Sequence, residues 1–298
     1  MRSNVKSIQE YLEEGNCSPT ACQLMLAGRL KYLREHETEL TGAAAAKIIG
    51  ISSAHLSRLE SGQRRWSEKQ LLKALRAYGY GSARDEELVR RLLRVSEEPE
   101  WTASFRSDAL PKWFEQFVEL ESVAEQIRSF ETRAVHGLLQ CHSYAQAVIA
   151  GDGVGSADVA QRRLALRRER QRRVFRQGGP TVWVVLEEAV LKRRFAEPRA
   201  MREQLLHLKS LVESNPRVKV QILPDDLAVN RPSSAFTHLK FNLRHVPDKV
   251  YIELPHGALY QDSAGEVEVQ RVALDNLAGW AYDEDKTPAI LDRIVKSF

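Results

Sequence analysis

The stretch from residue 20 to residue 79 consists of short apolar segments separated by helix-capping residues. The first segment has the three- and four-residue spacing of a helix, at Leu24, Leu26, Ala27, Leu30 and Leu33. Three further helices are predicted to begin after hydroxyl side chains that can accept hydrogen bonds from a first turn: Thr41, Ser52 or Ser53, and Ser67. Glycines end them, at Gly50, Gly62 and Gly79. Four helices in so short a stretch predict a compact all-α unit.

The rest of the chain alternates β-branched runs with helical spacing. Strands are expected at 127–132, 181–186, 218–223, 234–241 and 249–254, and helices at 113–125, 144–149, 199–214 and 267–280. A chain of 298 residues is long for one domain. The sequence therefore predicts an α+β protein: an all-α bundle at 1–80, a charged and helical connector at 81–110, and a mixed α/β domain at 111–298.

Composition narrows the class of protein. The hydrophobic fraction of 43% is ordinary for a chain that buries a core, and no apolar run is long enough to span a membrane. The early acidic residues and the lack of an apolar leader segment argue against secretion. Cys17, Cys22 and Cys141 are too few and too unevenly spaced for a disulfide framework or a zinc site. We expect a cytoplasmic protein without a metal or another cofactor.

Charge is unevenly distributed along the chain. Residues 20–80 hold 10 Lys/Arg against 5 Asp/Glu, and residues 81–160 hold 8 against 14. Residues 161–180 hold 8 against 1, and the chain as a whole has a net charge of +4. Such alternation indicates separate surfaces with separate partners.

The segment from Gly50 to Arg65 has the pattern that a helix reading the major groove requires. A small residue is needed where two helices cross, a residue tolerant of unusual backbone in the turn, and apolar residues behind the second helix. The small residue is Ala46, and the turn residue is Gly50. The apolar residues behind the second helix are Ile51, Leu56 and Leu59. The outer face is left with Ser53, Ala54, His55, Ser57 and Arg58. The alternative is an ordinary amphipathic helix that closes a small bundle and turns a solvated, charged face outward.

This segment resembles the XRE-type (repressor/Cro-like) helix-turn-helix at Ala46, Gly50, Ser57, Leu59, Glu60 and Gly62. The resemblance implies base contacts from Ser53, Ala54 and Arg58, and phosphate contacts from Gln63, Arg64 and backbone amides near Ser61. It also implies that Glu60 ties the recognition helix into the bundle. Gly42 departs from the pattern, because many relatives carry a glutamine there that contacts phosphate. One module is small for specific binding, so a homodimer on an inverted repeat is expected.

Later segments resemble actinobacterial XRE-type regulators with a large C-terminal domain of unknown function, described as WhiJ-like or antitoxin-like. The resemblance is carried by 129–149, 160–171, 182–193, 218–224 and 256–267. It implies control of transcription, often together with a small partner protein. His136 stands where relatives often have proline.

Eight arginines fall within a predicted helix at 161–176, in which Glu169 is the one acidic residue. Ala160, Leu164, Gln171 and Phe175 mark a narrow inner face, so most of the arginines are expected to point outward. Four readings remain open: a solvated helix with ion pairs, intramolecular pairing with the acidic 81–160 segment, an acidic partner protein, and DNA or a phosphorylated ligand. The candidate partner residues are Arg163, Arg167 and Arg170.

Features of an enzyme are sparse. Glu187 and Glu188 follow a strand, but neighbouring residues on a strand face opposite sides, and no nucleophile elbow or nucleotide loop accompanies them. A cleft lined by Trp183, Glu187, His256 and Tyr260 could bind a small molecule. We therefore expect no enzyme but a regulator that receives a signal from a small, acidic partner protein. The alternatives are a one-component sensor of a small molecule, and an enzyme domain carried on a DNA-binding module.

Overall fold

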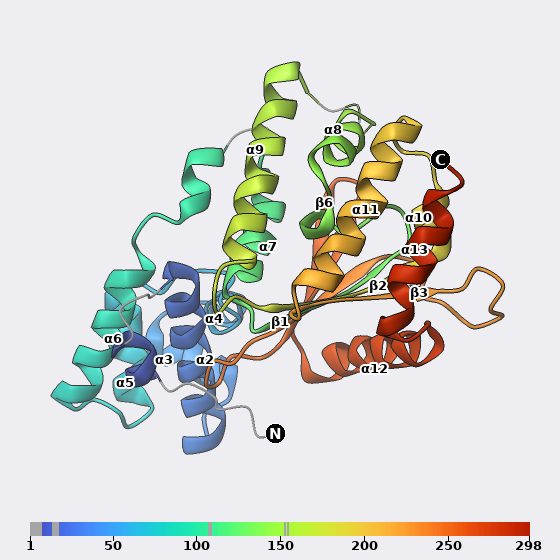
Figure 1. Ribbon diagram of the computed structural model, residues 1–298. Helices are drawn as coiled ribbons and strands as arrows, with labels where there is room; N and C mark the ends of the chain where they lie inside the picture. The colour runs from blue at the N-terminus through green and yellow to red at the C-terminus, as the bar shows by residue number, and fades with distance from the viewer. Residues whose placement is uncertain (1–7, 14–17, 107–108, 152, 154) are drawn as a thin grey trace. The chain divides into compact units, whose positions relative to one another are not determined.

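The computed structural model describes residues 8–13, 18–106, 109–151, 153 and 155–298. They form two compact units (Figure 1). The N-terminal unit comprises Met1–Ala103 and Phe241–Pro247, and the C-terminal unit comprises Ser104–Lys240 and Asp248–Phe298. Each unit has its own core and is described by itself.

The N-terminal unit is built mainly from helices. Its helices are α1 (Ile8–Glu13), α2 (Pro19–Glu37), α3 (Gly42–Ile49), α4 (Ser53–Glu60), α5 (Glu68–Ala77) and α6 (Ala83–Ser96). Thr41, Ser52 and Ser67 each accept a hydrogen bond from a backbone N–H of the first turn, which confirms the predicted caps. The helix expected in a connector is α6, and it packs in this unit through the buried residues Val89, Leu92 and Leu93.

The short segment Phe241–Pro247 completes the N-terminal unit, although its neighbours in sequence belong to the other unit. A Cβ atom added at Gly28 of α2 would lie 2.1 Å from the carbonyl oxygen of His245. Tyr32 of the same helix contacts the His245 ring, with centroids 3.9 Å apart. His245 has φ +63°, in the left-handed region that non-glycine residues rarely adopt. Close backbone approach at Gly28 therefore holds this segment against α2.

The C-terminal unit is built on one six-stranded sheet with the order β3-β2-β1-β4-β5-β6. The strands are β1 (Gln126–Glu131), β2 (Thr181–Glu187), β3 (Val218–Leu223), β4 (Phe236–Lys240), β5 (Lys249–Leu254) and β6 (Gly257–Gln261). The first three are parallel and the others pair antiparallel. Parallel neighbours need long crossovers, which the intervening helices supply.

Helices cover both faces of this sheet. They are α7 (Lys112–Val123), α8 (His142–Gly151), α9 (Ala157–Val174), α10 (Glu188–Lys192), α11 (Pro198–Ser214), α12 (Ala264–Trp280) and α13 (Thr287–Val295). Figure 1 shows α12 along one face, with α7, α9 and α11 over the other. Phe130, Val185 and Phe236 form a core with Leu274 and Leu277 of α12. Three short 3-10 helices complete the described elements, at Trp101–Phe105, Gly137–Leu139 and Glu284–Lys286.

The α+β architecture is the predicted one, an all-α region followed by a mixed sheet with helices. The strand expected at 234–241 is shorter, and β6 and α13 were not predicted. None of the helices in the described ranges has the length and apolar character that crossing a membrane requires. Cys22 and Cys141 are buried, whereas Cys17 lies outside the described residues.

Candidate nucleic-acid interface

The turn between α3 and α4 has the geometry that the sequence predicted. Ala46 is 1% exposed, where α3 meets its neighbours. Gly50 adopts φ +88° and donates its N–H to the Ala46 carbonyl oxygen at 2.9 Å, which ends α3 in a left-handed cap. The N–H of Ile51 reaches the same oxygen at 3.0 Å. Ser52 then caps α4 by accepting from the His55 N–H.

Helix α4 has two distinct faces. Leu56 and Leu59 are buried, at 1% and 0% exposure, and hold the helix from behind. The opposite side exposes the predicted reading residues Ser53, Ala54 and Arg58 together with Ser57, while His55 is half-buried. The helix therefore presents short side chains and one guanidinium to solvent.

The segment after α4 exposes two polar side chains, whereas its first backbone N–H groups form hydrogen bonds within the protein. The side chains of Gln63 and Arg64 are exposed, as phosphate contacts require. The Ser61 N–H instead donates to the Ser57 carbonyl oxygen at 2.9 Å, and the Gly62 N–H donates to Leu59 at 3.2 Å. The Ser61 and Gly62 amides therefore close the helix instead of contacting phosphate, whereas phosphate contacts through other backbone amides near Ser61 stay a prediction.

Glu60 anchors α4 to α2 through a buried ion pair. Arg34 Nε donates to Glu60 Oε1 and Arg34 Nη2 to Glu60 Oε2, each at 2.7 Å. The two side chains are 11% and 6% exposed, and the hydrogen bond to Glu60 raises the pKa of Arg34 above its usual value. Arg34 was missed in the sequence, although its position four residues after Leu30 puts it on the apolar side of α2.

The three candidate partner arginines of α9 lie in different environments. Arg170 is 5% exposed and forms a two-bond pair with Glu121 of α7, both bonds 2.9 Å long. Arg170 is therefore not a partner contact, and intramolecular pairing is the correct reading for this residue. Arg167 is half-buried and donates to the Gln140 side chain, and Arg163 is also half-buried.

The predicted small-molecule cleft is not formed. Trp183 lies on the α12 face of the sheet, with the Arg128 guanidinium 4.4 Å from the ring centroid, and Arg128 pairs with Asp275 of α12. Tyr260 lies on the opposite face, where its hydroxyl donates to the Trp113 carbonyl oxygen of α7 at 2.6 Å. Three strands separate β2 from β6. The other two residues predicted to line the cleft do not contact each other. Glu187 forms an ion pair with Arg231, and His256 is exposed next to β6.

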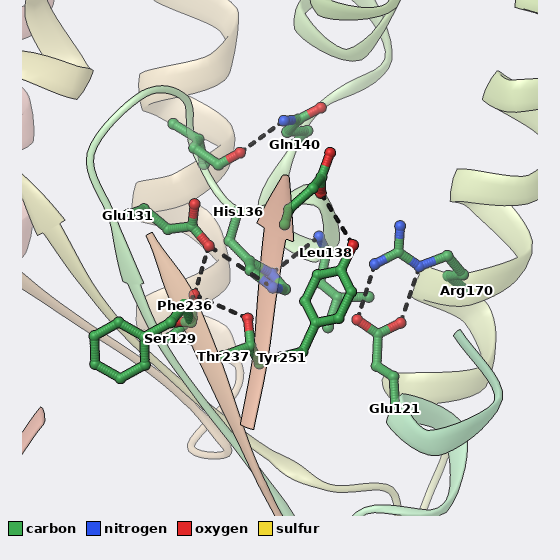
Figure 2. A network of polar contacts seen from close by, with 12 residues as sticks. Glu121, Ser129, Glu131, His136, Leu138, Gln140, Arg170, Phe236, Thr237 and Tyr251 are labelled. Atoms are coloured by element: carbon green, nitrogen blue, oxygen red, sulfur yellow. Dashed lines mark hydrogen bonds and ion pairs between the residues drawn. The ribbon is translucent and has the colours of Figure 1, made fainter. Parts of the chain in front are cut away.

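A buried polar network was also missed in the sequence (Figure 2). Ser129 and Glu131 lie on the same face of β1, with Ser129 Oγ 2.5 Å from Glu131 Oε1. His136 Nε2 lies 4.0 Å from the same carboxylate, and His136 Nδ1 accepts from the Leu138 N–H at 3.3 Å. Burial raises the pKa of Glu131 to about 8, whereas burial and nearby arginines lower that of His136 to about 3. At neutral pH the Glu131 and His136 side chains are therefore mostly uncharged.

Stability should depend on pH through Glu131. Its folded pKa of about 8 lies above the ordinary 4.5, so over this range the folded state binds more protons and the free energy of unfolding falls as pH rises. Glu131→Gln should remove this fall. Urea unfolding of the wild type and of Glu131→Gln from pH 5 to 8.5 measures the free energy of unfolding of each protein. The difference between the two curves removes the opposite contribution of His136, which both proteins share. Parallel curves for the two proteins would show that Glu131 is ionised in the folded state.

The surface depressions of the C-terminal unit include two beside the sheet. The first has a volume of about 540 Å³ and lies at the carboxyl ends of β2 and β3, lined by Glu188, Lys192, Asp225 and Arg293 among others. The second has about 510 Å³ and is lined by Trp183, Gln221 and acidic residues of the α12–α13 region. Among the residues that the structure describes, no group of three His, Cys, Asp or Glu side chains is placed to hold a metal ion.

Comparison with known families agrees with this division of the chain. A model described as a helix-turn-helix domain matches residues 25–92, which include α3, the Gly50 turn and α4. A second model, described as a domain of unknown function (DUF5753), matches residues 114–293. No curated protein and no solved structure matches the chain. The chain therefore carries a helix-turn-helix domain and, through a match over more than half of its length, belongs to the DUF5753 family.

Proposed function

We propose that the protein is a sequence-specific DNA-binding regulator of transcription that reads the major groove with α4. The observation that carries the proposal is the two-faced α4 behind the Gly50 turn. Leu56 and Leu59 are buried on one side, and Ser53, Ala54 and Arg58 are exposed on the other. A recognition helix requires this division between packing and reading.

Residues of α4 and of the segment after it have different expected roles in binding DNA, either contacting bases or contacting phosphates. Arg58 can form two hydrogen bonds with guanine, whereas Ser53 and Ala54 offer smaller contacts, such as one to a thymine methyl group. Exposed Gln63 and Arg64 supply phosphate contacts, which set the register on the duplex. The Glu60–Arg34 pair fixes the helix from behind. With one strong base contact, part of the specificity comes from DNA shape.

Selection of DNA from a random pool tests this function. The full-length protein is mixed with random duplexes, and bound DNA is recovered and sequenced over several rounds. We expect one enriched motif that contains a guanine at a fixed position. An unenriched pool would contradict the proposal.

Arg58→Ala should weaken binding to the selected sequence by about 5- to 150-fold, because one bidentate arginine–guanine contact supplies about 1–3 kcal/mol of discrimination. Binding to unrelated DNA should change far less. Fluorescence anisotropy with both duplexes measures the two affinities. Arg84→Ala, an exposed arginine in the first turn of α6, is the control and should leave the ratio unchanged. Equal ratios for wild type and Arg58→Ala would show that Arg58 does not read a base.

We further propose that the protein binds as a homodimer on an inverted repeat, and that the C-terminal unit receives the regulatory signal. A single helix-turn-helix unit covers little DNA, and two-fold symmetry in the protein is matched by half-sites one helical turn apart. A small, acidic partner protein is the first candidate for the signal. An enriched motif without a repeat, together with a monomeric mass by light scattering, would contradict the dimer.

A small-molecule signal is the second candidate, favoured by the depression of about 540 Å³ beside β2 and β3. Open sheets with parallel strands commonly bind ligands outside the carboxyl ends of those strands. Lys192 Nζ lies 2.9 Å from Glu188 Oε1 and 3.0 Å from Asp225 Oδ2, so the depression offers positive and negative groups to a ligand. A metabolite that raises the Tm of wild type but not of Lys192→Ala would support this candidate. We assign no catalytic reaction to the chain.

A further inference from the structure

The outer face of α9 carries a set of arginines that the core of the C-terminal unit does not use. Helix α9 buries Leu166, Arg170 and Val174, so this side packs inward. At 100° per residue, Arg162, Arg168 and Arg172 fall within an arc of about 120° on the other side. All three are exposed, and Arg176 is exposed just after the helix ends. We define Arg162, Arg168, Arg172 and Arg176 as the α9 basic face.

Acidic residues neutralise only part of this face. Glu169 pairs with Arg172 at 2.6 Å, and it also pairs with Arg173 at 2.8 Å. Asp158, in the first turn of α9, is the other acid on this side of the helix. Within the described ranges, the side chains of Arg162, Arg168 and Arg176 form no ion pair. Three exposed guanidinium groups therefore keep all their donors for an external anion.

We infer that the α9 basic face contacts the phosphate backbone of the DNA that the N-terminal unit binds. This inference rests on the proposed function, because that unit brings the polyanion to the chain. All eight basic residues at 161–176 are arginine, whose planar fork binds phosphate through two hydrogen bonds. Arg162 and Arg172 are ten residues apart, or about 15 Å along the helix, which matches about four phosphates of one strand at 3.4 Å each.

DNA suits this face better than an acidic protein does. The exposed contacts that this face offers are guanidinium groups spread along a line, whereas stable protein interfaces depend on buried aromatic or aliphatic anchors. A row of solvated arginines gains its binding energy mainly by displacing counterions from a polyelectrolyte. Such contacts add affinity without reading sequence, so α4 keeps that role.

Salt dependence of binding tests the inference. The probe is a 40-base-pair duplex of fixed, arbitrary sequence, and the full-length chain is titrated at several salt concentrations. The triple variant Arg162→Gln, Arg168→Gln, Arg176→Gln should flatten the slope of log Kobs against log salt by about 2.7, at about 0.9 per lost phosphate contact. Between 50 and 200 mM salt, this variant should therefore lose about 40-fold less affinity than wild type.

A matched control shows whether the change in slope depends on where the arginines lie or only on the net charge of the protein. Arg194→Gln, Arg199→Gln and Arg202→Gln remove the same charge from exposed arginines on and just before α11. This control should keep the wild-type slope. Glutamine preserves helix propensity, and equal Tm values for the three proteins show that all are folded.

Two results would overturn the inference. Equal slopes for wild type and the α9 variant would mean that no phosphate lies on this face, and an acidic protein lost from the variant would then identify the partner. Equal flattening in the variant and the control would reduce the effect to overall charge. Neither result touches the proposed function, which fails only if the random pool shows no enrichment.

Discussion

Arg170→Met should lower the free energy of unfolding of the C-terminal unit by about 3–5 kcal/mol, because it leaves a buried carboxylate without its counter-charge. Glu121 is 1% exposed, and both bonds between its oxygens and the Arg170 guanidinium are 2.9 Å long. Arg170 also lies over the Phe114 and Phe117 rings, 5.0 and 5.7 Å from their centroids. Methionine keeps much of the packing volume and removes only the charge and the hydrogen bonds.

Urea unfolding followed by circular dichroism measures this loss. Arg172→Met is the matched control, because Arg172 is 69% exposed and its surface pair with Glu169 contributes about 1 kcal/mol or less. In the double variant Glu121→Leu, Arg170→Met no buried charge remains, so most of the stability should return. If Arg170→Met and Arg172→Met were equally stable, the buried pair would have no special role in the core.

Gly28→Ala should destabilise the N-terminal unit by about 1–3 kcal/mol, the usual cost of overpacking. The added methyl group would lie 2.1 Å from the His245 carbonyl oxygen, which belongs to backbone and cannot rotate away. In an isolated helix the same change would be stabilising by about 1 kcal/mol. A loss of stability therefore reports the contact with Phe241–Pro247 and not the helix itself.

Hydrogen exchange with mass spectrometry gives the position of the effect. Amide protection should fall in Phe241–Pro247 and in the middle of α2. Gly42→Ala is the control, since no atom lies within 4 Å of a Cβ added there, and it should not lower stability. Unchanged protection of 241–247 in Gly28→Ala would mean that the segment does not depend on close approach to α2.

Local patterns in the sequence predicted the helices and several strands well, because capping and periodicity are properties of neighbouring residues. Thr41, Ser52 and Ser67 cap helices as expected, and Val218–Leu223 forms a strand with the predicted bounds. The short strand β6 was missed because its sequence, GALYQ, has little β-branched content. The order of the strands could not be derived, since it depends on pairings between residues far apart in the chain.

The candidate site shows the same limit. The exposed and buried sides of α4 follow from its spacing, so Arg58 and Leu59 could be placed in advance. The partner of Glu60 could not, because Arg34 lies 26 residues earlier and local spacing does not reveal the contact. Arg170 was expected outside for a related reason. Its partner Glu121 lies 49 residues away, and only that pairing makes a buried guanidinium stable.

The discontinuous N-terminal unit has a consequence for how the protein is made. Residues 1–103 leave the ribosome well before Phe241–Pro247, whose buried residues Phe241, Leu243 and Val246 complete the same unit. At about 5–20 residues per second, the gap amounts to roughly 7–30 s. During that time the surface of α2 around Gly28 is not yet covered by Phe241–Pro247. The N-terminal unit can therefore be completed only after translation has passed Pro247, by which point most of the C-terminal unit has also been made.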